Sequence, residues 1–92
     1  MNAILIKTDL TETTIYPKNK QAFEIQEFRE IVGGEIQIVY LDDKKAMVLK
    51  ESMFGDLNFN IKASNILKEK ALLEYGQFVK GIAIIVPIKY IN

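Results

Sequence analysis

Paired carboxylates perform acid–base chemistry in many hydrolases, and the sequence offers one adjacent pair, Asp42 and Asp43. Such a pair works when the two groups face each other across a substrate, whereas neighbours in a turn point apart and Asp favours turns. The chain has no histidine and no cysteine, which excludes a Ser–His–Asp triad, a thiol nucleophile and an ordinary zinc site. Neither GxxxxGK[ST] nor GxGxxG occurs. We therefore predict that the protein is not an enzyme and holds no metal and no cofactor.

The segment from Ser52 to Asn60 contains the best candidates for ligand binding. It mixes apolar side chains with polar groups able to orient a ligand, and long loops on small domains often carry function. The alternative interpretation is a packed connection whose Phe and Leu side chains cover the core before Asn60 begins a helix. Both interpretations stay open. The candidate ligand-binding residues are Phe54, Gly55, Asp56 and Asn58.

The charge pattern gives little support for a nucleic-acid partner. Twelve Lys and Arg balance twelve Asp and Glu, whereas proteins that grip duplex DNA usually carry a basic excess. Arg29 is the single Arg, which disfavours bidentate recognition of bases. No apolar run approaches the roughly 18 residues of a membrane-spanning helix. We expect no nucleic-acid partner, no membrane and, since no cysteine needs an oxidising compartment, a cytoplasmic location.

Hydrophobic periodicity divides the chain of 92 residues into seven elements within a single domain, residues 1–92. Apolar residues at helical spacing predict a helix over 23–32, ended by the glycine pair at 33–34. A second helix over 61–75 follows Asn60 as N-cap and ends at Gly76. Runs of β-branched and aromatic residues predict the strands, which are 3–7, 13–16, 35–41, 45–50 and 82–86.

The order of elements is therefore β-β-α-β-β-α-β, which predicts an α+β protein. The simplest packing is a single mixed sheet of about five strands with both helices on one face. The run Ile82–Val86 is apolar without a break, so we expect this strand to lie centrally and to be buried on both faces.

Two helices on one face would leave the opposite face of the sheet uncovered. The apolar residues expected there are Val39, Leu41 and Ile84. A symmetric homodimer is the commonest way to cover such a patch. The alternative is a strongly curled sheet that closes on these residues as a monomer.

Several segments together carry a family resemblance. They are the strand at 3–7, the helix and Ile-Val-Gly-Gly end at 23–34, the strand at 35–39, the Asp42-Asp43 turn, the segment 57–60 and the closing strand at 79–85. On these segments the chain resembles a family of small bacterial and phage-encoded proteins classified as a domain of unknown function. Members of that family often carry Pro where Asn58 stands and Asp where Ile82 stands. The resemblance implies no activity, and it implies a context of phages, plasmids and their hosts.

These observations predict a non-catalytic protein-interaction module derived from a phage or another mobile element. Its expected partner is a host protein, a phage protein or a second copy of the chain. The alternative function is a small-ligand protein that binds or sequesters a nucleotide or metabolite with the loop at 52–60. A pocket lined by that loop would favour the ligand, whereas a flat apolar sheet face would favour the interaction module.

Overall fold

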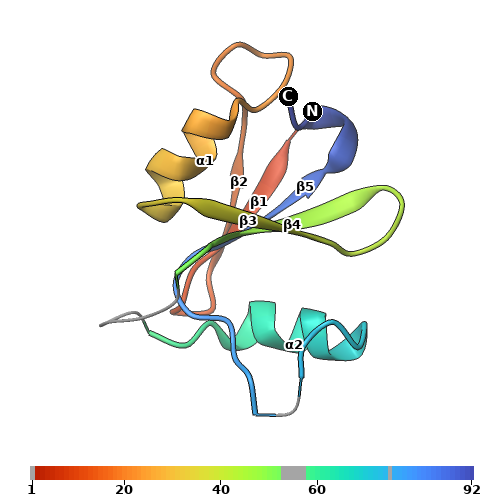
Figure 1. Ribbon diagram of the computed structural model, residues 1–92. Coiled ribbons are helices and arrows are strands. Elements are labelled where there is room, and N and C mark those ends of the chain that lie inside the picture. Colours follow the sequence, from red (N-terminus) through yellow and green to blue (C-terminus); the bar gives the residue numbers. More distant parts are fainter. Residues whose placement is uncertain (1, 53–57, 75) are drawn as a thin grey trace.

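Within the residues that it describes, the computed structural model contains one five-stranded sheet and two α-helices (Figure 1). The structure describes residues 2–52, 58–74 and 76–92. The elements are β1 (Ala3–Ile6), β2 (Glu12–Ile15), α1 (Ile25–Val32), β3 (Ile36–Tyr40), β4 (Lys45–Lys50), α2 (Ile61–Glu69), β5 (Ala83–Pro87) and a short 3-10 helix, η1 (Ile88–Tyr90). The predicted α+β class and element order are confirmed.

The strand order is β2-β1-β5-β4-β3, and each neighbouring pair is antiparallel. The expected mixed sheet is therefore wrong. Short turns join β1 to β2 and β3 to β4, and such hairpins are antiparallel. The chain then leaves β4, forms α2 and enters β5 beside Leu49, so β5 runs back along β4. The prediction that β5 is central is confirmed, since it lies between β1 and β4 with Ala83, Ile84 and Val86 buried.

The two helices pack on opposite faces of the sheet, which corrects the expectation that both cover one face. Strand pairing turns Val48 and Ile84 toward one face and Met47 toward the other. Phe28 of α1 belongs to the core cluster of Val48 and Ile84, whereas Leu67 of α2 belongs to the cluster of Met47. The physical reason is that β4 and β5 are apolar on both sides, so each face needs its own cover.

Helix α1 ends at Val32, as the sequence predicts, but begins at Ile25, two residues later than predicted. The backbone N–H of Glu24, the N-cap, donates to Glu27 Oε1 at 3.2 Å. The stacked rings of Phe23 and Phe28, with centroids 5.2 Å apart, fix the entry of the chain into the helix. Gly33 ends the helix at φ 84°, a left-handed conformation that glycine adopts without strain.

Helix α2 is shorter than predicted, because it ends at Glu69 and not near Gly76. Ala71 takes the left-handed conformation, with φ 55°. Its N–H donates to Lys68 O at 3.0 Å, and Leu72 N–H donates to Leu67 O at 2.8 Å. This pair of bonds is the Schellman motif that stops a helix, here closed by Ala in the place that glycine usually takes.

Candidate functional site

The structure describes one of the four predicted ligand-binding residues. Phe54, Gly55 and Asp56 lie outside the described residues. Asn58 is exposed, and its carbonyl oxygen accepts a hydrogen bond from Gly81 N–H at 2.8 Å. The backbone of Asn58 thus helps to join the segment before α2 to the segment before β5.

The three residues predicted for a shared interface do not lie on one surface. Ile84 is completely buried in the core cluster that contains Phe28 of α1, so it is not available to a partner in the folded protein. Val39 and Leu41 are half-buried and pack against the other cluster, which contains Leu67 of α2. The prediction assumed one apolar face of the sheet without a helix. That assumption is wrong, because α1 and α2 cover opposite faces.

A buried polar network holds the start of α2 against the sheet. Asn60 is fully buried, and its Nδ2 donates to Ile6 O at 3.0 Å and to Gly81 O at 2.9 Å. Its Oδ1 accepts from Ala63 N–H at 3.0 Å, which makes the predicted N-cap. One side chain therefore connects β1, the segment before β5 and α2.

Ser64 extends this network to the segment before β5. Its hydroxyl donates to Asn60 O at 2.8 Å and accepts from Val79 N–H at 2.8 Å. Asn60 N–H in turn donates to Val79 O at 2.8 Å, and Phe59 pairs with Lys80 in an antiparallel bridge. The segments around Phe59 and Val79 are thus fixed side by side below the sheet, where α2 lies in Figure 1.

This pairing presents two exposed phenylalanines together. Phe59 is 51% exposed and Phe78 is 41% exposed, and their rings meet edge to face with centroids 5.3 Å apart. Phe23 and Phe28, in contrast, are buried in the core. We name Phe59, Phe78 and the lysines over their rings, Lys68 and Lys80, the aromatic patch.

The two lysines of the aromatic patch add positive charge above the rings. Lys68 Nζ lies 4.1 Å from the centroid of Phe78, and Lys80 Nζ lies 5.2 Å from the centroid of Phe59. Both distances fall within the range of cation–π interactions. The patch therefore combines apolar ring surface with cationic groups that are held close to it.

An apolar groove of about 460 Å³ adjoins the aromatic patch at Phe78. It lies between β3 and β4 on one side and the segment that leads from α2 to β5 on the other. Gln37 and Gln77 supply amide groups at this otherwise apolar site, and Gln77 Oε1 accepts from Glu74 N–H at 3.2 Å. The full lining is Gln37, Val39, Leu49, Leu67, Leu72, Leu73, Gln77, Phe78 and Val79.

Among the residues that the structure describes, two carboxyl groups have a pKa below the ordinary value, and both belong to turns. Backbone N–H groups of Lys44 and Lys45 donate to Asp42 Oδ1 and lower the pKa of that carboxyl. The hydroxyl and N–H of Thr11 donate to Asp9 Oδ1 and lower its pKa likewise. The predicted turn role of Asp42 is therefore confirmed. A lowered pKa favours the ionised carboxylate, whereas a general acid must hold a proton to donate.

The described part of the chain offers neither a cluster of metal-binding side chains nor a helix fit to cross a membrane. Residues 2–52, 58–74 and 76–92 contain no group of three or more acidic, histidine or cysteine side chains placed to hold a metal ion. Within the same ranges, no helix has the length and apolar character needed to span a membrane.

Comparison with known proteins does not place the chain in a family. It matches no protein-family model, no curated protein and no solved structure. The resemblance to the phage-related domain of unknown function thus stays a hypothesis, and the geometry of the site carries the functional argument.

One of the two interpretations of the segment at 52–60 has its Phe and Leu side chains cover the core, whereas Phe59 is 51% exposed in the structure. A signal for the aromatic patch was present in the sequence Phe78-Val79-Lys80. An alternation of this kind places Val79 inward and the other two side chains outward when the segment is extended. Val79 is indeed buried, and Phe78 is exposed.

Proposed function

We propose that the protein is a non-catalytic protein-interaction module and that the aromatic patch binds its partner. The single observation that supports this proposal is the half-exposed pair of Phe59 and Phe78 on two segments that backbone hydrogen bonds join. Aromatic side chains are enriched at protein interfaces because they bury large areas with little loss of conformational freedom. The fixed pairing of the two segments reduces that loss further.

The partner that we propose is another protein in the cytoplasm, of a phage or of its host, as the family resemblance implies. We also propose a second copy of the chain as a partner. It binds a surface other than the sheet face with Val39, Leu41 and Ile84 that the sequence predicted.

A pair of matched variants tests the role of the aromatic patch. Phe59→Ala with Phe78→Ala removes the exposed rings, and Tyr16→Ala removes an aromatic that is 67% exposed elsewhere. Each variant serves as bait for crosslinking and mass spectrometry in host cells. We expect one or more partners that crosslink to residues of the patch, are lost with the double variant and are kept with Tyr16→Ala. Equal recovery of the same partners by both variants would refute the proposal.

A small-ligand protein is the second candidate function, and the groove beside Phe78 favours it. A volume of about 460 Å³ falls within the range of known ligand sites. A thermal-shift screen of nucleotides and metabolites tests this candidate, since a ligand stabilises the folded state by mass action. Leu72→Trp fills the groove from its exposed side, so a shift in wild type that this variant abolishes would support the ligand. A shift that survives Leu72→Trp would contradict binding in the groove.

A further inference from the structure

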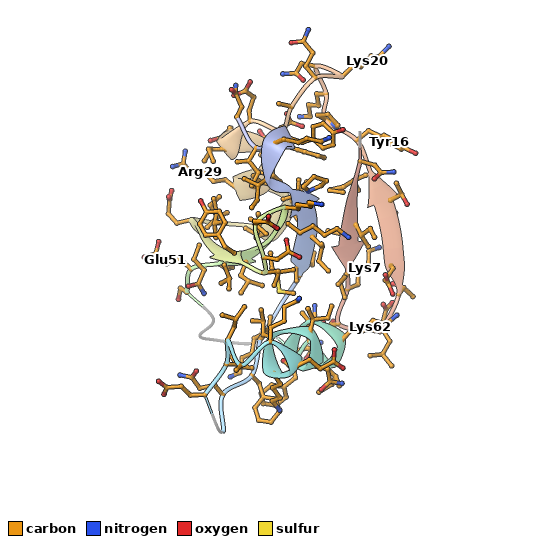
Figure 2. All side chains as sticks on the ribbon, turned by 90° about the vertical axis from the view of Figure 1, so that its right-hand side faces the viewer. Lys7, Tyr16, Lys20, Arg29, Glu51 and Lys62 are labelled. Carbon is orange, nitrogen blue, oxygen red and sulfur yellow. The ribbon has the colours of Figure 1, made fainter. Side chains whose placement is uncertain are left out.

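The sheet ends in two edge strands, β2 and β3, which lie on opposite sides of the molecule. In Figure 2, Tyr16 marks the side of β2, and Glu51, whose N–H bonds to Glu35 O just before β3, marks the other side. An edge strand carries a row of backbone N–H and C=O groups that no strand of its own sheet can satisfy. Each edge is therefore a template for a further strand unless the sequence protects it.

The hydrogen-bond pattern shows which groups of β3 point outward. Leu41 N–H donates to Lys45 O at 2.9 Å, and Glu51 N–H donates to Glu35 O at 2.8 Å. Because antiparallel ladders alternate, the odd-numbered residues of β3 bond to β4 and the even-numbered residues point away. Ile36, Ile38 and Tyr40 therefore direct their N–H and C=O groups outward, and no residue of the described part of the chain satisfies them.

The edge at β2 carries protective features. Glu12 stands within this four-residue strand, and its Oε2 lies 2.6 Å from Lys62 Nζ at the end of the sheet near α2 (Figure 2). Pro17 follows two residues after the strand and cannot donate a hydrogen bond. Short length, charge and proline are the usual means by which proteins prevent edge pairing.

The edge at β3 lacks the charge and the proline. Its sequence, Ile-Gln-Ile-Val-Tyr, contains no charge and no proline, and all five residues pair with β4 in continuous register without a bulge. Tyr40 is 60% exposed. Uncharged, flat strands rich in β-branched and aromatic residues are the ones that accept another strand.

We propose that two copies of the chain join through their β3 edges, antiparallel and centred on Ile38, so that one sheet runs through both copies. This inference rests on the proposed function, because it specifies the surface by which a second copy of the chain binds, and that surface is distinct from the aromatic patch. Pairing about Ile38 lets the outward groups of Ile36, Ile38 and Tyr40 in each copy meet those of the other. The register uses the whole of β3.

The side chains of β3 suit a second copy as the occupant. In this register Ile36 lies opposite Tyr40 of the second copy, two apolar residues on the face that α1 covers. Beyond the strand, Glu35 of one copy lies opposite Leu41 of the second copy, so no like charges face each other across the junction. The formal net charge of zero also removes long-range repulsion between copies.

Matched proline variants at the two edges test the proposal. Tyr40→Pro removes an outward N–H and leaves the bonds between β3 and β4 intact, because Tyr40 is not a bonded residue of that pair. Thr14→Pro makes the same change at β2, where Lys7 N–H bonding to Thr11 O shows that Thr14 also points outward. Sedimentation should show a wild-type dimer, a dissociation constant raised at least about tenfold by Tyr40→Pro, and no change with Thr14→Pro.

Amide hydrogen exchange of the wild-type protein gives a second readout that does not depend on a variant. In the dimer the amides of Ile36, Ile38 and Tyr40 should exchange at least about tenfold more slowly at high than at low protein concentration. The amide of Thr14 should show no such dependence. A monomer at millimolar concentration, a dimer whose β3 amides exchange freely, or equal weakening by both proline variants would each overturn the proposal.

Discussion

Replacing Asn60 by Ala should destabilise the protein more than any other single polar substitution among the residues described. The side chain is fully buried and makes three hydrogen bonds, to Ile6 O, Gly81 O and Ala63 N–H. Alanine removes all three and leaves the start of α2 without its cap. Two elements distant in sequence, β1 and α2, then lose the side chain that joins them.

The expected loss follows from these bonds. A helix cap contributes about 1 kcal/mol, and each of the two bonds to carbonyl oxygens contributes about 1 kcal/mol net. The loss in the free energy of unfolding should therefore be about 3 kcal/mol, from a total of about 5–14 kcal/mol for a chain of this length. With a urea m-value of about 1–1.5 kcal/mol/M, the midpoint should fall by about 2–3 M.

Urea unfolding followed by circular dichroism measures this loss, and Asn65→Ala provides the control. Asn65 lies exposed on the same helix, so its replacement should change stability by less than about 0.5 kcal/mol. Asn60→Asp keeps an oxygen for Ala63 N–H but lacks the donor for Ile6 O and Gly81 O, and it should be at least as damaging as alanine. A loss below about 1 kcal/mol for Asn60→Ala would show that the network does not hold α2 to the sheet.

Three other predictions follow from the core, from a turn and from the ends of the helices. Phe28→Ala and Leu67→Ala should each cost about 2–5 kcal/mol in urea unfolding, because each empties a buried site on a different face of the sheet; a cost below about 0.5 kcal/mol at either position would place that residue outside the core. Hydrogen bonds hold the pKa of Asp42 below its ordinary value of 3.8, so its contribution to stability is present above about pH 4 and lost as the pH falls through the folded-state pKa. Wild type should therefore lose stability more steeply than Asp42→Asn on acidification below about pH 4, and parallel pH profiles would contradict this role. Gly33→Ala should destabilise the protein by about 1 kcal/mol and Ala71→Gly should stabilise it by about 0.5 kcal/mol, since both residues have a left-handed backbone conformation. Thermal unfolding measures both changes, and a shift of the midpoint in the same direction for both variants would contradict this reasoning.

The element order was predictable because each element carries its own local signal. The glycine pair after Val32 ends α1, Asn60 begins α2, and the unbroken run Ile82–Val86 identifies the central strand. The end of α2 was not predictable in the same way. Ala71 closes the helix in a conformation that alanine disfavours, so the sequence carries no residue there that marks a stop.

The placement of the helices was missed although the sequence contained a signal for it. Residues 46–49 of β4 are all buried and form an unbroken apolar run, as in β5. Two adjacent strands that are apolar on both sides need cover on both faces, which one helix on each face supplies. Burial on both faces, expected for β5 alone, would have predicted helices on opposite faces had it been expected for β4 as well.

The alternation at 78–80 indicates that Phe78 is exposed, but no local pattern specifies its contact with Phe59. Phe59 and Phe78 meet because Asn60 and Ser64 bond to the backbone of the segment 79–81. Loss of Asn60 should therefore weaken the partner contact together with stability, whereas loss of the β3 edge should leave that contact intact. The two proposed surfaces draw on different parts of the fold: the patch requires the buried polar network below the sheet, and the edge requires only the register of β3 on β4.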